Sequence, residues 1–104
     1  VTINPSLADN MPISVLESLA SGVPVVSTNI GGVAYLVKDG ETALLVPPGD
    51  HAAMAAALLR LLREAELARH LSAAGLAEVR QYAWPNVRER LLSVYQTVLA
   101  GAQR

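Results

Sequence analysis

The sequence predicts an α/β fold built on a small parallel sheet. Residues 23–26 and 43–46 are apolar runs without alternation, which is typical of strands that are covered on both faces. Apolar residues at helical spacing precede and follow these runs, and glycine and proline mark the boundaries. Because strand and helix patterns alternate, we expect a partial Rossmann-like parallel sheet of about three strands, with flanking helices and a C-terminal helical tail.

The individual elements follow from these patterns and from the turn residues between them. In chain order we expect a strand at 1–3, a helix at 12–21, a strand at 24–28, a helical turn at 33–37, a strand at 43–46, a helix from its cap at Asp50 to residue 64, a helix at 66–81 with a break near Gly75, and a helix at 84–100.

The helix expected at 12–21 has a start signal and a stop signal. Asn10 can cap its first amides, and Pro12 has the fixed φ that suits a first turn. Gly22 accepts the left-handed conformation that often follows a helix, and Pro24 cannot continue one. The expected core face of this helix comprises Ile13, Leu16, Leu19 and Ala20. In the later helices the expected inward residues are Met54, Leu58, Leu61, Leu62 and Ala65, followed by Val87, Leu91, Val94, Tyr95 and Val98.

Length and composition bound what the chain can be. With 104 residues, 52% of them apolar, it can form one small domain with a single core. No apolar run approaches the roughly 20 residues that span a bilayer, and the first residues do not show the charged-then-apolar pattern of a signal segment. The absence of cysteine excludes disulfides and fits a reducing compartment, so we expect a cytoplasmic location, with a membrane-peripheral location of the parent protein as the alternative. Because the chain opens without methionine in a strand-like run, we expect a fragment of a longer protein.

Charge is distributed unevenly around a net charge of −1. Residues 1–50 hold one cation, Lys38, against five acids, whereas residues 51–104 hold seven arginines against four glutamates. The arginines alternate with glutamates along helices and have no aromatic residues interleaved, which is typical of a solvated helix face. We therefore expect no nucleic-acid partner.

The stretch around which the chain is organised runs from Asn4 to Thr28 and joins a loop, a helix and a buried strand. Asp9 and Glu17 stand in this stretch with seven residues between them. A helix that begins in a loop beside an α/β sheet favours anion binding, because its first amides are unpaired and its dipole is positive there. The stretch therefore predicts a site for an anionic ligand.

The region from Asp9 to Asp50 resembles the donor-binding half of retaining glycosyltransferases of the GT-B fold, the large family 4 type. The resemblance is carried by the ordered string Asp9, Glu17, Ser18-Leu19-Ala20-Ser21-Gly22, Val23-Pro24-Val25-Val26, Ser27-Thr28, Gly31-Gly32, Val37-Lys38-Asp39-Gly40-Glu41-Thr42 and Leu44-Leu45-Val46-Pro47-Pro48-Gly49-Asp50. It implies a single partial domain, in which residues 1–50 bind a nucleotide-sugar and residues 51–104 form a helical region.

The resemblance also assigns roles to individual residues. Asp9 and Glu17 would be the two functional acids of the catalytic site, with Glu17 at the ribose hydroxyls and Asp9 at hydroxyls of the transferred sugar. Family enzymes of this type need no metal or other cofactor. The other substrate-binding residues that the resemblance implies are Asn10, Met11 and Pro12 at the sugar, the amides of Ile13 and Ser14 at the phosphates, and Thr28, Gly31 and Gly32 at the border of the crevice.

Three departures from the family pattern limit what the chain can do alone. Asp9 replaces the commoner glutamate, and Pro12 removes an amide that could touch the sugar. Tyr35 replaces the acid that usually follows the glycine pair. The family's phosphate-binding arginine and lysine, the first half of the donor domain and the acceptor domain all lie upstream of the matching segment. We therefore expect the isolated chain to be inactive.

Each candidate residue also has a plain structural interpretation. Taken alone, Asp9 is more often a loop acid or a cap, and Glu17 is more often a solvated helix residue. The pair of glycines alone indicates a turn. His51 and His70 have no partners at metal-binding spacing, so we expect no metal site. The order of the whole string favours a functional role for both acids.

Two other functions remain open. The segment could belong to a sugar-nucleotide epimerase of the same GT-B architecture, which would need additional acid–base residues. It could instead be a non-catalytic module that binds a nucleotide or a protein. Whatever the function, the strand at 1–3 lacks the neighbour that it would have in a complete donor domain. We therefore expect the isolated chain to self-associate through this strand edge or the adjacent apolar surface.

Overall fold

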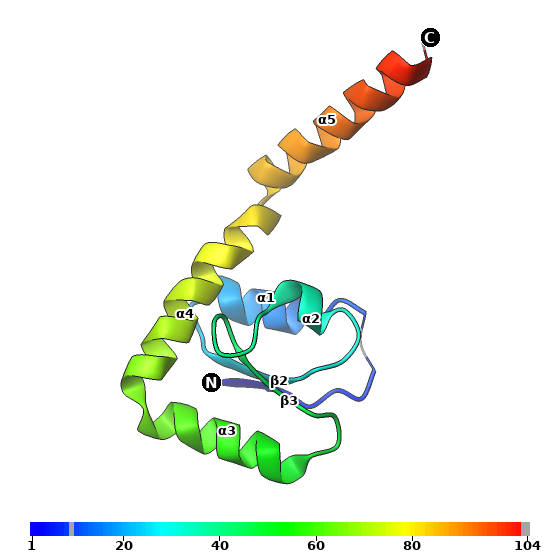
Figure 1. The fold of residues 1–104 in the computed structure, drawn as a ribbon. Coiled ribbons are helices and arrows are strands. Elements are labelled where there is room, and N and C mark those ends of the chain that lie inside the picture. Colours follow the sequence, from blue (N-terminus) through cyan, green and yellow to red (C-terminus); the bar gives the residue numbers. More distant parts are fainter. Residues whose placement is uncertain (9, 103–104) are drawn as a thin grey trace.

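The structure is a computed structural model that describes residues 1–8 and 10–102. It combines a three-stranded sheet with helices on either side and a long helix at the C-terminal end (Figure 1). The elements are β1 (Thr2–Asn4), α1 (Ile13–Ala20), β2 (Val25–Thr28), α2 (Val33–Leu36), β3 (Leu44–Val46), α3 (His51–Arg63), α4 (Ala65–Val79), the 3-10 helix η1 (Arg80–Tyr82) and α5 (Trp84–Ala102).

The sheet is parallel throughout, with strand order β1-β2-β3, which confirms the predicted fold class. Asn4 pairs with Ser27, and Thr28 pairs with Val46, so the carboxyl ends of the three strands meet at one edge of the sheet. All four residues of β2 are buried: Val25 and Val26, as the apolar run predicted, and also the polar Ser27 and Thr28. In the described part of the chain β1 has no second neighbour, and Ile3 is 42% exposed.

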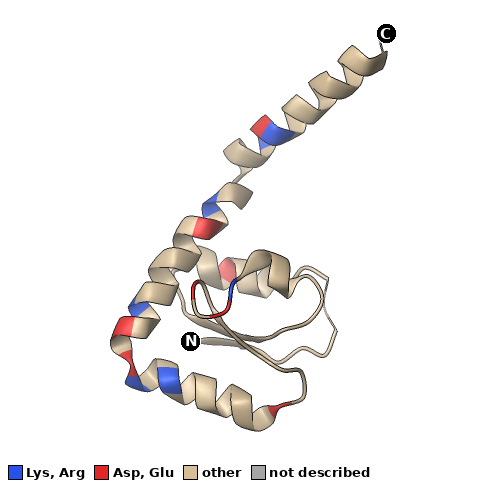
Figure 2. Cartoon of the chain, viewed as in Figure 1, with Lys and Arg blue, Asp and Glu red and all other residues tan. Residues whose placement is uncertain are grey.

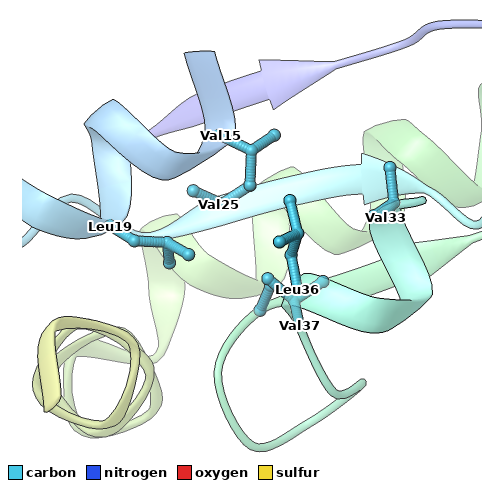
Figure 3. Packing of buried hydrophobic residues seen from close by; sticks show 7 residues of the cluster. Val15, Leu19, Val25, Val33, Leu36 and Val37 are labelled. Atoms are coloured by element: carbon cyan, nitrogen blue, oxygen red, sulfur yellow. The ribbon is translucent and has the colours of Figure 1, made fainter. Parts of the chain in front are cut away.

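Helices cover both faces of the sheet and create two apolar clusters. Because side chains alternate across a strand, Val25 points to one face and Val26 to the other. The first cluster joins β2 to α1 and α2 (Figure 3), and the second joins the sheet to α3 and α4. Their buried members are Val15, Leu19, Val25, Val33, Leu36, Val37 and Ala43 in the first, and Val26, Leu44, Val46, Leu61 and Leu71 in the second.

The buried face of α1 differs from the prediction. Val15 and Leu19 are buried and Leu16 is partly buried, whereas Ile13 is 64% exposed and Ala20 is exposed. Residues two apart on a helix point about 200° apart, so burial of Val15 turns Ile13 towards solvent. On α3 the prediction holds for Leu61, which is buried, but Leu62 is exposed and Ala65 begins α4.

Helix α4 runs through Gly75 without the predicted break. Gly75 is buried against α1, where a Cβ would lie 2.7 Å from Leu19 Cδ2 and 3.3 Å from the carbonyl oxygen of Thr42. The glycine therefore allows close packing of α4 on α1 and does not end the helix.

Helix α5 projects away from the sheet and its covering helices (Figure 1). Its N-terminal part contacts η1. The residues predicted to face inward are exposed, including Leu91, Val94, Tyr95 and Val98, and Val87 is half-buried. The apolar pattern at 84–100 therefore correctly predicted a helix, but within the described residues the apolar side chains of α5 do not pack into a core.

Among the described residues as a whole, no helix is long and apolar enough to cross a membrane.

Basic residues are spread over the helical half of the chain and are interspersed with acidic ones (Figure 2). Arg60 pairs with Glu64 at 3.1 Å and Arg69 with Glu66 at 3.0 Å, in both cases within a single helix. All four side chains are more than half exposed, so each pair adds little to stability. The arrangement is the solvated helix face that the sequence indicated.

Candidate functional site

The candidate site lies at the edge of the sheet where the three strands end. Loops 5–12, 29–32 and 47–50 leave this edge after β1, β2 and β3. In open parallel sheets ligands bind beside the carboxyl ends of the strands. The structure thus gathers most of the site residues predicted from sequence on two of these three loops and on the first turn of α1.

A set of buried and partly buried hydrogen bonds ties the start of loop 5–12 to β2. The hydroxyl of Thr28 donates to the carbonyl oxygen of Ser6 at 2.6 Å, and it lies 3.4 Å from the carbonyl oxygen of Asn4. Ser6 Oγ donates to Asn4 Oδ1 at 2.8 Å, and Asn4 Nδ2 donates to Ser27 Oγ at 3.1 Å. Ser27 Oγ in turn donates to the carbonyl oxygen of Thr28 at 3.0 Å. These four residues, Asn4, Ser6, Ser27 and Thr28, are called the loop clamp below.

The end of the same loop packs against the glycine loop after β2. A Cβ on Gly32 would lie 1.6 Å from the carbonyl oxygen of Asn10, so no other residue type fits there without movement of the backbone. The neighbouring Gly31 has φ of +50°, a conformation that favours glycine. The glycine pair is therefore more than a turn, because it brings two loops of the candidate site into contact.

The start of α1 differs in detail from the prediction. Pro12 is itself the N-cap, with φ −75° and ψ 99°, and it makes no side-chain cap hydrogen bond, so Asn10 does not have the predicted capping role. The carbonyl of Pro12 accepts from the amides of Val15 and Leu16 at 3.1 and 3.3 Å. Among residues 1–8 and 10–102, no backbone carbonyl accepts from the amides of Ile13 and Ser14. Within the described residues, the first turn of α1 therefore presents two amides that have no backbone acceptor.

Of the two predicted acids, the structure describes only Glu17. Asp9 lies outside the described residues. Glu17 is exposed on α1, one turn after the helix start, where it borders a groove of about 420 Å³ between α1 and the end of α4. The rest of this groove is lined mainly by apolar residues, with one cation and one aromatic ring; its lining comprises Leu16, Ala20, Leu76, Val79, Arg80, Tyr82 and Ala83.

Thr28 borders a different recess. This recess, of about 200 Å³, lies between the loops after β1 and β3, and Pro5, Leu7, Pro47, Gly49, Asp50, His51 and Met54 form its other walls. The structure therefore brings Asn10, Gly31, Gly32 and the start of α1 together, and it places Glu17 and Thr28 on separate concavities.

Sequence reasoning missed Arg80 and Tyr82, which border the groove of Glu17. Arg80 looked like one more arginine on a solvated helix face. Its place beside α1 results from the packing of α4 on that helix, which involves residues more than 50 positions apart. No local pattern could have revealed it. In contrast, Asn4, a polar residue at the end of an apolar strand, was a readable signal for the loop clamp.

Within the described residues, no cluster of three or more His, Asp or Glu side chains could hold a metal ion. Asp50 is occupied as a helix cap, since its Oδ1 accepts from the amide of Ala53 at 2.9 Å. His51 follows it in the first turn of α3 and is exposed.

The comparisons with known proteins agree with this geometry. Residues 1–64, more than half of the chain, match the sequence model of the family described as Glycosyl transferases group 1. A phosphatidyl-myo-inositol mannosyltransferase from Mycobacterium leprae is 38% identical over 96 residues, which are 92% of this chain and 26% of that protein.

Two solved structures resemble the fold. Sucrose-phosphate synthase from Thermosynechococcus elongatus superimposes with a TM-score of 0.85 and 31% identity, over 95% of this chain and 25% of that one. An Anabaena protein solved in complex with UDP-glucose superimposes with a TM-score of 0.77 over 86% of this chain and 27% of that one; at 18% identity, this likeness concerns the fold alone.

The chain spans about a quarter of the length of these relatives. The family match covers β1 to α3 and so includes the sheet, its three loops and α1. This chain belongs to the glycosyl transferases group 1 family.

Proposed function

We propose that this chain forms the nucleotide-sugar-binding part of a retaining, family 4 type glycosyltransferase, which transfers a hexose from a nucleoside diphosphate sugar to an acceptor. The observation that carries the proposal is the convergence of loop 5–12, the glycine loop and the open start of α1, in a chain of the glycosyl transferases group 1 family. Residues 1–50 would supply the donor contacts, and residues 51–104 would support them.

The amides of Ile13 and Ser14 would bind oxygens of the donor diphosphate. When the sugar leaves, the bond between the anomeric carbon and the phosphate oxygen breaks, and negative charge grows on the diphosphate. Amide donors at a helix start, aligned with the helix dipole, stabilise such charge. The absence of an acidic side chain in the first turn of α1 is consistent with this role.

Hydrogen-bond acceptors would bind the hydroxyl groups of the transferred sugar and of the ribose. Asp9, with polar groups of Asn10, Met11 and Pro12, would bind hydroxyls of the transferred hexose, since an ionised carboxylate accepts several hydrogen bonds. Glu17 would bind the two ribose hydroxyls in the same way. Gly31 and Gly32 would let the backbone approach the ligand closely.

The reaction needs groups that this chain does not supply. Before Lys38 the sequence holds no lysine or arginine, so the cations that neutralise the diphosphate would come from a preceding segment, together with the acceptor-binding domain. Arg80 borders the groove of Glu17 and would reduce the repulsion between this carboxylate and a phosphate. Neither a metal nor another cofactor is assigned a role. The chain alone would be inactive, and its cytoplasmic location remains a prediction.

The UDP-glucose complex of the Anabaena protein, which shares the fold, supports a nucleotide-sugar as the donor class. No feature of the site favours the epimerase or the non-catalytic module. The proposal is tested by turnover of a panel of isotope-labelled nucleotide-sugars by the full-length protein, with the product anomer assigned by NMR. A product that keeps the donor's anomeric configuration supports the proposal. An inverted product, or a free epimerised nucleotide-sugar, contradicts it.

A further inference from the structure

Thr28 was expected to border the donor crevice, but the structure gives its hydroxyl another partner. The side chain is 3% exposed, and its hydroxyl donates to the carbonyl oxygen of Ser6 at 2.6 Å. A threonine hydroxyl has one proton, so this bond leaves none for a ligand. Because the hydroxyl cannot donate to a ligand and the side chain is buried, we expect its effect on the donor to pass through the loop that it holds.

We propose that Thr28 is a positioning residue, whose hydroxyl fixes loop 5–12 in the conformation that receives the transferred sugar. This inference rests on the proposed function, because the loop carries the groups assigned to that sugar. The hydroxyl acts at the root of the loop, since Ser6 stands two residues after the end of β1.

The other members of the loop clamp strengthen the same attachment. Asn4 is 7% exposed and Ser27 is fully buried, and each donates to another member of the clamp. Ser6 Oγ closes the set by donating to Asn4 Oδ1. Across the described residues no buried side-chain nitrogen or oxygen lacks a partner. Buried hydrogen-bond sets in which every member is satisfied are rigid, because no member can move without leaving a group unpaired.

A second contact holds the other end of the loop. The backbone of Gly32 packs against the carbonyl of Asn10, four residues after Ser6. Ser6 and Asn10 are thus each held in place, Ser6 by Thr28 of β2 and Asn10 by Gly32 of the loop that follows β2. A loop held in this way before the ligand arrives loses less conformational entropy on binding.

The first experiment measures the loop directly, without a ligand. Hydrogen–deuterium exchange is compared in the full-length protein and in the variants Thr28→Val, which removes the hydroxyl at constant shape, and Thr28→Ser, which keeps it. Thr42→Val is the matched control, because Thr42 is also buried, at 7% exposure, and its Oγ1 accepts from the amide of Lys38 in another loop.

We expect Thr28→Val to accelerate exchange in a peptide that covers residues 5–12 by about tenfold, the scale of losing one buried hydrogen bond. Thr28→Ser should exchange like the wild type. Thr42→Val should accelerate exchange around residues 38–44 and leave residues 5–12 unchanged. Equal exchange of residues 5–12 in the wild type and Thr28→Val would overturn the inference.

The second experiment asks whether the loop acts on the sugar. Calorimetry gives the dissociation constants of UDP, GDP and ADP and of their glucose conjugates for each variant. For the pair that the wild type binds, Thr28→Val should weaken the nucleotide-sugar about tenfold more than the nucleotide alone, because a smaller fraction of molecules holds the sugar-binding loop conformation. Thr28→Ser and Thr42→Val should keep the wild-type ratio.

The outcomes separate the inference from the proposed function. An unchanged ratio in Thr28→Val, with normal wild-type binding, overturns the positioning role only. If the wild type binds none of the six compounds, the proposed function fails, and the exchange experiment still decides whether Thr28 holds the loop.

Discussion

Gly32 lies directly against the backbone carbonyl of Asn10, so that a Cβ at residue 32 would stand 1.6 Å from that oxygen. The contact joins the loop after β1 to the loop after β2. Glycine is required here because there is no room for a Cβ. The backbone conformation does not require it, since Gly32 has φ of −77°, which any residue can adopt. A side chain at this position must therefore displace one of the two loops.

Replacement of Gly32 by alanine tests this contact. We expect Gly32→Ala to destabilise the protein by about 1–3 kcal/mol, the usual cost of overpacking, and to weaken nucleotide-sugar binding at least about tenfold. Urea unfolding and calorimetry on the full-length protein measure the two effects. Gly101→Ala is the control, because nothing lies within 4 Å of a Cβ there and alanine favours a helix. Wild-type stability in Gly32→Ala would show that the two loops are not in contact.

Glu17 is the acid of the pair that the structure describes. We expect Glu17→Gln to weaken nucleotide-sugar use by about 1–3 kcal/mol, since a charge-assisted acceptor is replaced by a neutral one. The measurement is kcat/KM for the donor in the full-length protein. Glu66→Gln serves as the control, because its carboxylate is 90% exposed and makes a surface pair with Arg69. A donor kcat/KM in Glu17→Gln that equals the wild-type value, as is expected for Glu66→Gln, would show that Glu17 is not part of the site.

Gly75 controls how closely α4 packs on α1. We expect Gly75→Ala to lower the free energy of unfolding by about 1–3 kcal/mol from overpacking, reduced by about 1 kcal/mol from the better helix propensity of alanine. Because the nearest atom is the flexible end of Leu19, the variant Leu19→Val should relieve part of the strain. A double-mutant cycle by urea unfolding therefore should give a favourable coupling energy. Additive effects would mean that the two residues do not touch.

The free edge of β1 leads us to expect self-association of the isolated chain. Val1 and Ile3 are exposed there at 48% and 42%, and an unpaired apolar strand edge recruits a second edge. Sedimentation equilibrium at about 0.1 mM would detect a two-fold dimer whose dissociation constant is near 1 μM. Ile3→Lys should give a monomer, whereas Leu92→Lys on α5 should not. A wild-type monomer, or dissociation by Leu92→Lys alone, would contradict pairing through β1.

Several features that depend on local chemistry were predicted correctly. The apolar run of β2, the cap at Asp50 and the left-handed glycine at residue 22 act within a few residues, and the structure shows all three. The match to the ordered family string also identified the loops that form the candidate site. Capping and φ preference are decided by neighbouring residues, and an apolar run marks in the sequence itself a strand that is covered on both faces.

Features that depend on tertiary packing were not predictable from the pattern. Val15 is buried in place of Ile13, because the orientation of α1 is set by its contacts with the sheet and α4. Arg80 reaches the groove of Glu17 through the same packing. The role of Thr28 in the loop clamp needed the position of Ser6, which follows from the parallel register of β1 and β2.

The most direct test of the central claim is an amide NMR titration of the full-length protein with the nucleotide-sugar that it turns over. The account predicts that the largest shift changes within this chain occur at the amides of Ile13, Ser14, Gly31 and Gly32, with little change along α3 and α5. Saturable binding that leaves these four amides unchanged and shifts residues elsewhere in the chain would contradict it.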